Sequence, residues 1–69
     1  MLVKHSFSLC GHRTSVALEA EFWAILQAEA RRLDTPLSAY VSAIDTARGD
    51  RALASALRLA ALEAAQRRP

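Results

Sequence analysis

The first eighteen residues of the chain contain basic side chains and no acidic ones. Lys4 and Arg13 are the cations of this segment, His5 and His12 accompany them, and all seven Asp and Glu residues lie from Glu19 onward. A guanidinium group offers paired N–H donors that suit phosphates and the edge of guanine. Because the net charge of the whole chain is only +2, the segregation of charge, more than its total, indicates a polyanionic partner for this segment.

Other kinds of chemistry find little support. His5, Cys10 and His12 supply at most three metal ligands, without a fourth or an acidic neighbour, so we expect no metal and no cofactor. No nucleophile elbow, glycine-rich phosphate loop or pair of carboxylates places the serines, histidines and aspartates for catalysis, and we expect no enzymatic activity. Cys10 is the only cysteine, which excludes an intrachain disulfide, and we interpret it as a small apolar residue.

The segment that carries Arg13 alternates between two kinds of side chain. Thr14, Val16 and Leu18 fall on one side, and Arg13, Ser15 and Ala17 fall on the other. This period of two predicts a half-buried strand with a core face and a small or cationic face. A helical period begins directly after Leu18, which leaves no room for a return strand downstream. We therefore expect residues 13–18 to lack a partner within their own chain and to pair with a second copy.

Two alternatives remain open for residues 1–11. The run from Leu2 to Leu9 also alternates, and Cys10-Gly11 suits a tight turn because glycine tolerates a positive φ. The segment is therefore either an extra strand, folded back as a hairpin, or an N-terminal arm.

A helical period replaces the alternation from Ala20 to Leu33. Its apolar stripe consists of Phe22, Trp23, Ile25, Leu26, Ala30 and Leu33. Acidic residues in the first turn and arginines in the last turn complement the helix dipole. We interpret Phe22 and Trp23 as core or dimer-interface residues rather than as a platform on which bases stack.

A second helix is predicted after the break at residues 34–36. The residue before a proline avoids helical dihedral angles, and proline suits the first helical position. We therefore expect Thr35 to be the N-cap, with Pro36 at the first position. This helix is predicted to end near Arg48, with Gly49 as its stop.

A third helix is predicted from Arg51 to about Gln66, with Asp50 as its N-cap. Its leucines and alanines cover a wide arc, which suits a dimer interface better than a single packed face. Arg67 and Arg68 are predicted to form a solvated tail.

The size of the chain favours association with another copy. Sixty-nine residues make one small core, which seldom gives much stability without a disulfide, a metal or oligomerisation. Although 52% of the residues are hydrophobic, no apolar run approaches the roughly 20 residues that cross a bilayer. No secretory signal pattern is found either, so we expect a cytoplasmic protein without a membrane partner.

The order strand, helix, short turn and helix resembles the ribbon-helix-helix family of DNA-binding proteins, the Arc/MetJ-like fold. The residues that carry the resemblance are Gly11-His12-Arg13-Thr14-Ser15, Leu18-Glu19, Phe22-Trp23, Leu37-Ser38-Ala39 and Ser55-Ala56-Leu57-Arg58. They are similar to short bacterial members with an added C-terminal helix. The resemblance implies a mainly α fold with a short β-ribbon, built as an intertwined homodimer. Residues 12–48 would form the ribbon-helix-helix core, and residues 49–69 the C-terminal helix and tail.

In this family, two chains each give one strand to an antiparallel ribbon that lies in the DNA major groove. The resemblance implies that Arg13, Ser15 and Ala17 face the base edges. Arg13 discriminates best, because a bidentate contact to guanine O6 and N7 is worth roughly 1–3 kcal/mol against a wrong base. Ala17 departs from the long polar residue often found there, and suits contact with a thymine methyl group or a close approach of the backbone.

The resemblance also implies a DNA phosphate at the start of the second helix. Thr35, Leu37 and Ser38 match the family's positions, Leu37 through its backbone only. Free backbone N–H groups and the helix dipole favour an anion there. Pro36 has no N–H and is expected to remove one donor.

Together these features predict a homodimer that binds double-stranded DNA selectively, as a small transcriptional regulator of bacterial or phage type, for example a repressor. The alternative is a protein-interaction module, such as an antitoxin subunit whose C-terminal helix binds a toxin or another effector. A structural dimer that has lost DNA binding is a third possibility.

Overall fold

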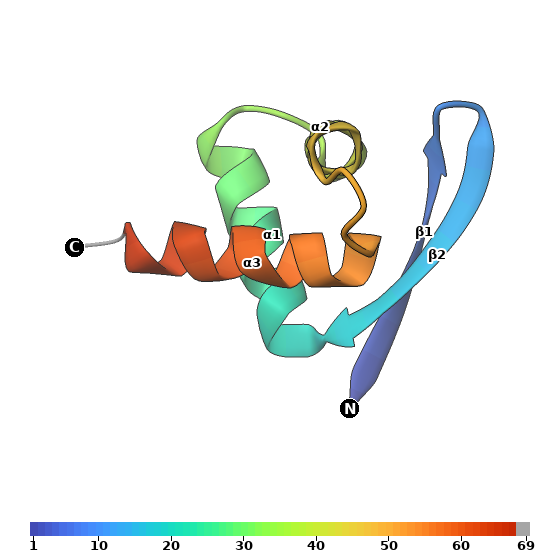
Figure 1. The fold of residues 1–69 in the computed structure, drawn as a ribbon. Helices are drawn as coiled ribbons and strands as arrows, with labels where there is room; N and C mark the ends of the chain where they lie inside the picture. Colours follow the sequence, from blue (N-terminus) through green and yellow to red (C-terminus); the bar gives the residue numbers. More distant parts are fainter. Residues whose placement is uncertain (68–69) are drawn as a thin grey trace.

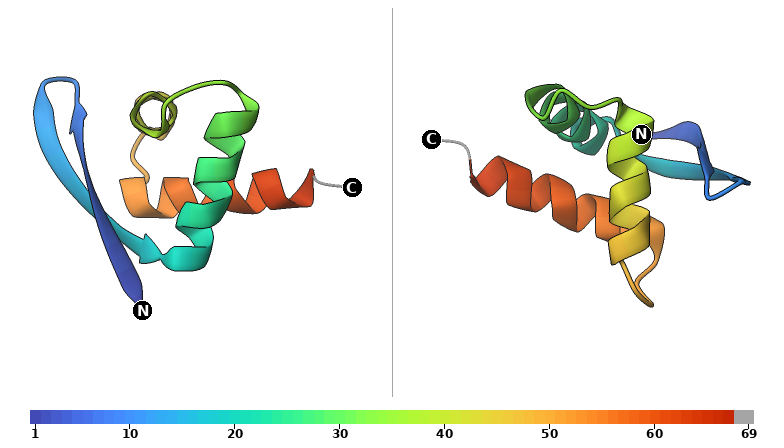
Figure 2. Two further views of the ribbon diagram at one scale, coloured as in Figure 1. Left: turned by 180° about the vertical axis from the view of Figure 1, so that it is seen from behind. Right: turned by 90° about the horizontal axis from the view of Figure 1, so that it is seen from above.

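The structure, a computed structural model, describes residues 1–67 as a two-stranded hairpin followed by three helices (Figure 1). The elements are β1 (Leu2–Leu9), β2 (His12–Glu19), α1 (Ala20–Arg32), α2 (Leu37–Ala47) and α3 (Leu53–Gln66). The hairpin stands to one side of the helices, and α1 and α3 cross each other (Figure 2). The expected mainly α class, with a short β-ribbon and a third helix, is confirmed.

β2 pairs with β1 along its whole length. The register runs from Leu2 opposite Glu19 to Leu9 opposite His12. The expectation that residues 13–18 lack a partner within their own chain is therefore wrong, and the extra strand is the alternative that the structure shows for residues 2–9.

The turn at the tip of the hairpin explains this pairing. Cys10 and Gly11 have positive φ angles of 52° and 80°, as in the type I′ turns that join two strands in register. Cys10 is a free thiol exposed at this tip and does not pack in the core.

The register divides the hairpin into two faces, because residues opposite each other in an antiparallel pair share a face. The inner face, turned toward the helices, consists of Val3, His5, Phe7, Leu9, His12, Thr14, Val16 and Leu18. The outer face consists of Leu2, Lys4, Ser6, Ser8, Arg13, Ser15, Ala17 and Glu19. The buried residues of the hairpin, Phe7, Leu9, Val16 and Leu18, all belong to the inner face. Hydrophobic burial therefore sets which side of the hairpin meets solvent.

Trp23 attaches the hairpin to α1. Its indole Nε1–H donates a 2.7 Å hydrogen bond to the carbonyl of Val3. Its ring meets His5 edge-on with 4.4 Å between centroids and lies 5.9 Å from the ring of Phe7. The side chain is buried, and Phe22 packs half-buried against the same core. The interpretation of both aromatic residues as packing residues is confirmed within the single chain.

The three helices close the core around Leu26, Val41 and Leu57, none of which has exposed surface. The inward residues of α3 recur at helical spacing as Leu53, Ala56, Leu57, Ala60, Ala61 and Ala64. Leu59 and Leu62 lie off this stripe and remain 43% and 49% exposed. Within one chain, the wide apolar arc of α3 is therefore covered along one side.

The turn that ends α1 is a Schellman motif. Asp34 has a φ of +54°. Its N–H donates to the carbonyl of Arg31 at 3.0 Å, and the N–H of Thr35 donates to the carbonyl of Ala30 at 2.9 Å. Two otherwise unpaired carbonyl groups of the last turn are thereby satisfied, and Thr35 belongs to the cap of α1.

This geometry corrects the predicted start of the second helix. The hydroxyl of Thr35 donates to the carbonyl of Leu33 at 3.0 Å, so it turns back toward α1. Pro36 occupies the N-cap position with extended dihedral angles, and α2 begins at Leu37. The predictions of Thr35 as N-cap and of Pro36 as the first helical residue are wrong by one position.

The connection to α3 is partly as predicted. Gly49, with a φ of +62°, follows the last turn of α2 and confirms the predicted stop. Asp50 is not the N-cap, because α3 begins only at Leu53. The guanidinium of Arg48 donates to the carbonyl of Arg51 at 2.7 Å, and the N–H of Arg51 donates back at 3.2 Å. These bonds hold residues 48–51 in a turn, so α3 begins later than the predicted Arg51.

Glu29 ties α1 to the end of α3. Its side chain is almost fully buried and accepts hydrogen bonds from Arg32 at 3.0 and 2.7 Å and from Arg67 at 2.7 Å. The Glu29 carboxylate raises the pKa of Arg32, and burial, followed by the charge of Glu29, raises the pKa of Tyr40. The side chain of Arg67 is 62% exposed, as predicted for a solvated tail, but it is anchored by its ion pair with Glu29. Arg68 lies outside the described residues.

We predict that Trp23→Phe loosens the hairpin more than the helices. The variant leaves the part-buried Val3 carbonyl without its indole donor, and losing such a hydrogen bond costs about 0.5–1.5 kcal/mol. Urea unfolding should report this loss, and amide exchange should accelerate most in β1. Unchanged stability and exchange would show that the indole does not hold the hairpin.

Candidate nucleic-acid interface

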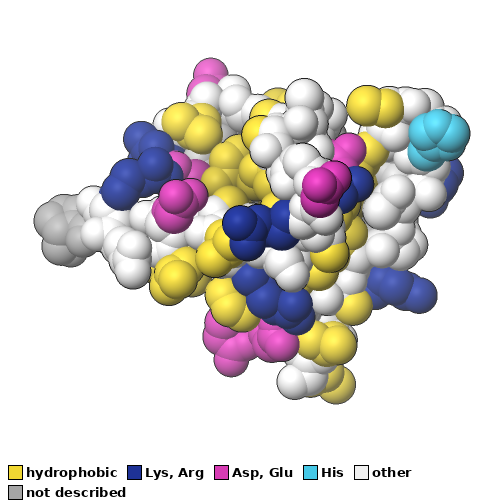
Figure 3. All heavy atoms as spheres, in the orientation of Figure 1, with side chains coloured by type: hydrophobic (Ala, Val, Ile, Leu, Met, Phe, Trp, Pro, Cys, Tyr) yellow, Lys and Arg dark blue, Asp and Glu magenta, His cyan; other side chains and the backbone are white. Residues whose placement is uncertain are grey.

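The outer face of the hairpin is the strongest candidate for binding a polyanion. Lys4 and Arg13 are exposed on it, and exposed serine hydroxyls lie between them. The space-filling view shows Lys, Arg and His side chains without acidic ones on the right, where the hairpin lies, and basic and acidic side chains mixed over the helices (Figure 3). The structure therefore keeps the charge segregation of the sequence on a solvent-facing surface.

The three expected base-contacting residues lie together on this face. Arg13 and Ser15 are exposed, and Ala17 is half-buried. They are placed by the alternation of β2, which directs Val16 and Leu18 into the core. Their common orientation follows from the burial of their neighbours.

β1 adds Lys4, Ser6 and Ser8 to the outer face, and none of them is among the expected base-contacting residues. Ser8 lies opposite Arg13, and Lys4 lies opposite Ala17. Between these pairs, the hydroxyl groups of Ser6 and Ser15 share a 2.9 Å hydrogen bond. The sequence contains the information needed to place these residues, because a two-residue turn at residues 10–11 fixes the register of the two strands and so determines which residues share a face.

Glu19, the carboxylate on the outer face, forms an ion pair with Arg58. The guanidinium of Arg58, from α3, contacts the carboxylate oxygens of Glu19 with a closest N–O distance of 3.0 Å and lies 5.8 Å from the ring centroid of Phe22. The backbone N–H of Glu19 and then Arg58 lower the pKa of this carboxyl group. Its negative charge is thus offset by a cation from α3.

The expected phosphate-binding position lies at the start of α2. The N–H groups of Leu37, Ser38 and Ala39 precede the first helical hydrogen bond, which runs from Tyr40 to the carbonyl of Pro36 at 3.0 Å. Pro36, which has no N–H to offer, stands at the N-cap, so the amides of the first three helical residues are all retained. No side chain caps this helix end, and Ser38 is exposed beside it.

Thr35 contributes differently from the expectation. Its hydroxyl hydrogen is directed to the carbonyl of Leu33, which leaves the oxygen as an acceptor rather than a donor toward an anion. Of the three residues expected to bind phosphate, Leu37 and Ser38 present backbone donors, whereas Thr35 does not present its hydroxyl as one. The amide of Ala39 is a third donor that the sequence analysis did not name.

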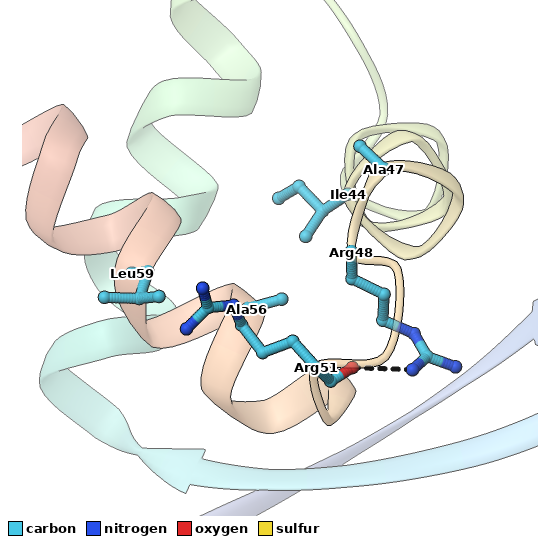
Figure 4. A pocket seen from close by; sticks show the side chains of 6 residues that line it. All are labelled: Ile44, Ala47, Arg48, Arg51, Ala56 and Leu59. Atoms are coloured by element: carbon cyan, nitrogen blue, oxygen red, sulfur yellow. Dashed lines mark hydrogen bonds between the residues drawn. The ribbon is translucent and has the colours of Figure 1, made fainter.

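A shallow pocket of about 280 Å³ lies between α2 and α3 (Figure 4). It is lined by Ile44, Ala47, Arg48, Arg51, Ala56 and Leu59. The side chain of Arg51 extends toward Leu59, while the guanidinium of Arg48 binds the carbonyl of Arg51. The pocket is apolar with a basic rim, and no titratable pair suited to catalysis lines it.

The three side chains considered as metal ligands are not brought together. His5 lies on the inner face against Trp23, and Cys10 is at the exposed tip. Among residues 1–67, no group of three or more His, Cys, Asp or Glu side chains is arranged to hold a metal ion.

A hairpin with one buried and one basic face, packed against three helices, defines a small domain with an exposed β-ribbon. The chain belongs to the ribbon-helix-helix family: the sequence profile of the ribbon-helix-helix domain matches residues 2–65. This family has a DNA-binding, regulatory character rather than a typically enzymatic one. No curated protein and no solved structure matches the chain. In the described part, no helix has the length and apolarity needed to span a membrane.

We predict that Arg58→Gln reduces the loss of folding stability that occurs as the pH falls into the acid range. The lowered pKa of Glu19 means that its interactions stabilise the fold above the pKa of the unfolded chain. This stabilisation is lost as the pH falls through the folded pKa. The difference in unfolding free energy between wild type and variant should therefore be largest near neutral pH and shrink in acid, as measured by urea unfolding at a series of pH values.

The matched control replaces the titrating group. In a Glu19→Gln background, Arg58→Gln should change stability by the same amount at every pH. A pH-independent difference in the wild-type background would contradict the role of the Arg58–Glu19 pair.

Proposed function

We propose that the protein is a homodimeric, sequence-selective DNA-binding protein, a small transcriptional regulator of the cytoplasm whose β-ribbon enters the major groove. One observation carries the proposal: Arg13, Ser15 and Ala17 lie on the exposed face of a hairpin in a chain of the ribbon-helix-helix family. The major groove is wide enough for a two-stranded ribbon. The outer face is the surface that such a ribbon turns to the bases.

Each residue of this face has a distinct part in the proposal. Arg13 reads guanine through a bidentate contact. Ser15 shares a hydrogen bond with Ser6 and retains the capacity for one further bond to a base edge. Ala17 allows a close approach or contacts a thymine methyl group. Specificity then depends mainly on Arg13.

Phosphate contacts position the ribbon. The amides of Leu37 and Ser38, at the positive end of α2, bind a phosphate oxygen, and the hydroxyl of Ser38 lies beside them. With a net charge of only +2, the affinity depends on these local contacts and should fall steeply with salt.

The argument for a dimer differs from the one made on the sequence. Since β2 has a partner in its own chain, the dimer does not follow from an orphaned strand. It is supported by the family, and by the outer edge of β2, which makes no backbone–backbone hydrogen bond with another part of the described chain. An eight-residue edge strand without a proline is a template for pairing with another strand.

We predict that sedimentation equilibrium gives a mass twice the 7.5 kDa of one chain. The dimer should persist without DNA, because it would depend on strand pairing and apolar contacts rather than on the nucleic acid. A monomer at the concentrations that saturate DNA would contradict the homodimer.

We predict that Arg13→Ala abolishes selective DNA binding. The loss of a guanine contact worth roughly 1–3 kcal/mol per subunit should remove the preference for a selected genomic fragment over random duplex, as measured by fluorescence anisotropy. The fold and the dimer should be unaffected, because the side chain is exposed. Arg51→Ala, which removes a cation from the pocket between α2 and α3, is the matched control and should bind like wild type.

The second candidate function is a protein-interaction module such as an antitoxin subunit. Its support is the exposure of Leu59 and Leu62 on α3, beside the apolar pocket. The wild-type anisotropy titration discriminates between the two functions. Absence of binding to all genomic fragments at low salt would favour the module over the regulator.

A further inference from the structure

We propose that β1 widens the DNA-binding surface, with Lys4 binding a backbone phosphate at each wall of the major groove. In this arrangement the β2 strands of two copies form the central ribbon and the β1 strands flank it, in the order β1-β2-β2-β1. The inference rests on the proposed function and adds to it a phosphate-binding residue outside the ribbon strand.

The two edges of the hairpin favour this order. On β1, the carbonyl of Val3 is bound by the indole of Trp23 at 2.7 Å, so helix α1 engages the backbone of this strand. Neither strand makes a backbone–backbone hydrogen bond beyond the hairpin in the described chain, so the Trp23 bond to Val3 is what distinguishes the edge of β1 from that of β2. A second copy therefore meets an open edge at β2, and the partner's β2 is the occupant that preserves the alternation of the outer face.

The dimensions of the sheet and of DNA agree with this arrangement. Neighbouring strands lie about 4.8 Å apart, so the outer strands of a four-stranded sheet are separated by roughly 14 Å. The major groove is about 12 Å wide. Two central strands fit within the groove, whereas the outer two lie over its phosphate walls.

The register directs Lys4 toward these walls. Lys4 is exposed on the outer face and lies opposite Ala17, whose single methyl group leaves space above the sheet for the lysine chain. The ammonium is a compact, flexible charge that suits a phosphate better than a base edge. Lys4 therefore contributes affinity without sequence preference, and Arg13 contributes the preference.

The test measures binding against salt for Lys4→Gln. Each phosphate contact adds about 0.9 to the slope of log affinity against log salt, and the dimer carries two such lysines, so the slope should fall by roughly 2. Affinity should fall by a similar factor on a selected genomic fragment and on random duplex of equal length. Lys4→Arg should keep the wild-type slope, and Arg51→Gln should do so as the control.

The outcomes separate this inference from the function on which it rests. If Lys4→Gln keeps the wild-type slope and affinity while Arg13→Ala loses selectivity, β1 does not bind DNA and only the inference fails. If Lys4→Gln changes base preference instead of the slope, the phosphate role is wrong. If the wild type binds no DNA, the proposed function fails as well. Circular dichroism and sedimentation confirm that each variant is folded and has the wild-type oligomeric state.

Discussion

The attachment of the hairpin to the helices is the constraint on which the candidate site depends. Trp23 binds the backbone of β1, and the apolar inner-face residues Phe7, Leu9, Val16 and Leu18 are buried against the helices. Because side chains alternate along a strand, burying Phe7 and Val16 directs Ser6, Ser8 and Arg13 outward, and a slip of one residue would reverse the two faces. The basic surface is therefore a consequence of the core, and changes in hairpin packing will change what it offers to a partner.

The third helix contributes to this surface from a distance. Leu57 closes the core from α3, and Arg58, the next residue, offsets the charge of Glu19 at the far end of the outer face. One turn of α3 thus supports both the packing and the electrostatics of the hairpin. This double role gives a physical reason for a C-terminal helix in a chain with so small a core, apart from any partner that binds Leu59 and Leu62.

Local patterns in the sequence predicted the faces of the elements, and tertiary contacts decided the rest. The alternation around Arg13, the stripe containing Trp23 and the stop at Gly49 follow from local sequence. The structure agrees with all three, except that Leu33, at the end of the predicted stripe, is 46% exposed. The pairing of β2 with β1 does not follow from local sequence. A period of two identifies which residues share a face, but it does not identify the neighbouring strand. The predicted start of α2 is one residue too early. Asp34 adopts a left-handed conformation, which makes Thr35 part of the C-terminal cap of α1. The contact between Arg58 and Glu19 joins distant segments, and no local pattern encodes it.

Because the hairpin forms within one chain, the free energy of dimerisation does not include the entropy cost of ordering β2. In an intertwined ribbon, each strand becomes ordered only when the second chain arrives, and association then carries the entropy loss of ordering the backbone. Here β2 is already paired with β1 and supported by Trp23. A two-stranded hairpin alone is only marginally stable in water, so the helices beneath it are needed to keep this edge in place. A second copy that pairs along β2 would then meet a rigid strand whose outer face is already oriented, and the free energy of association would be available for contacts between the subunits.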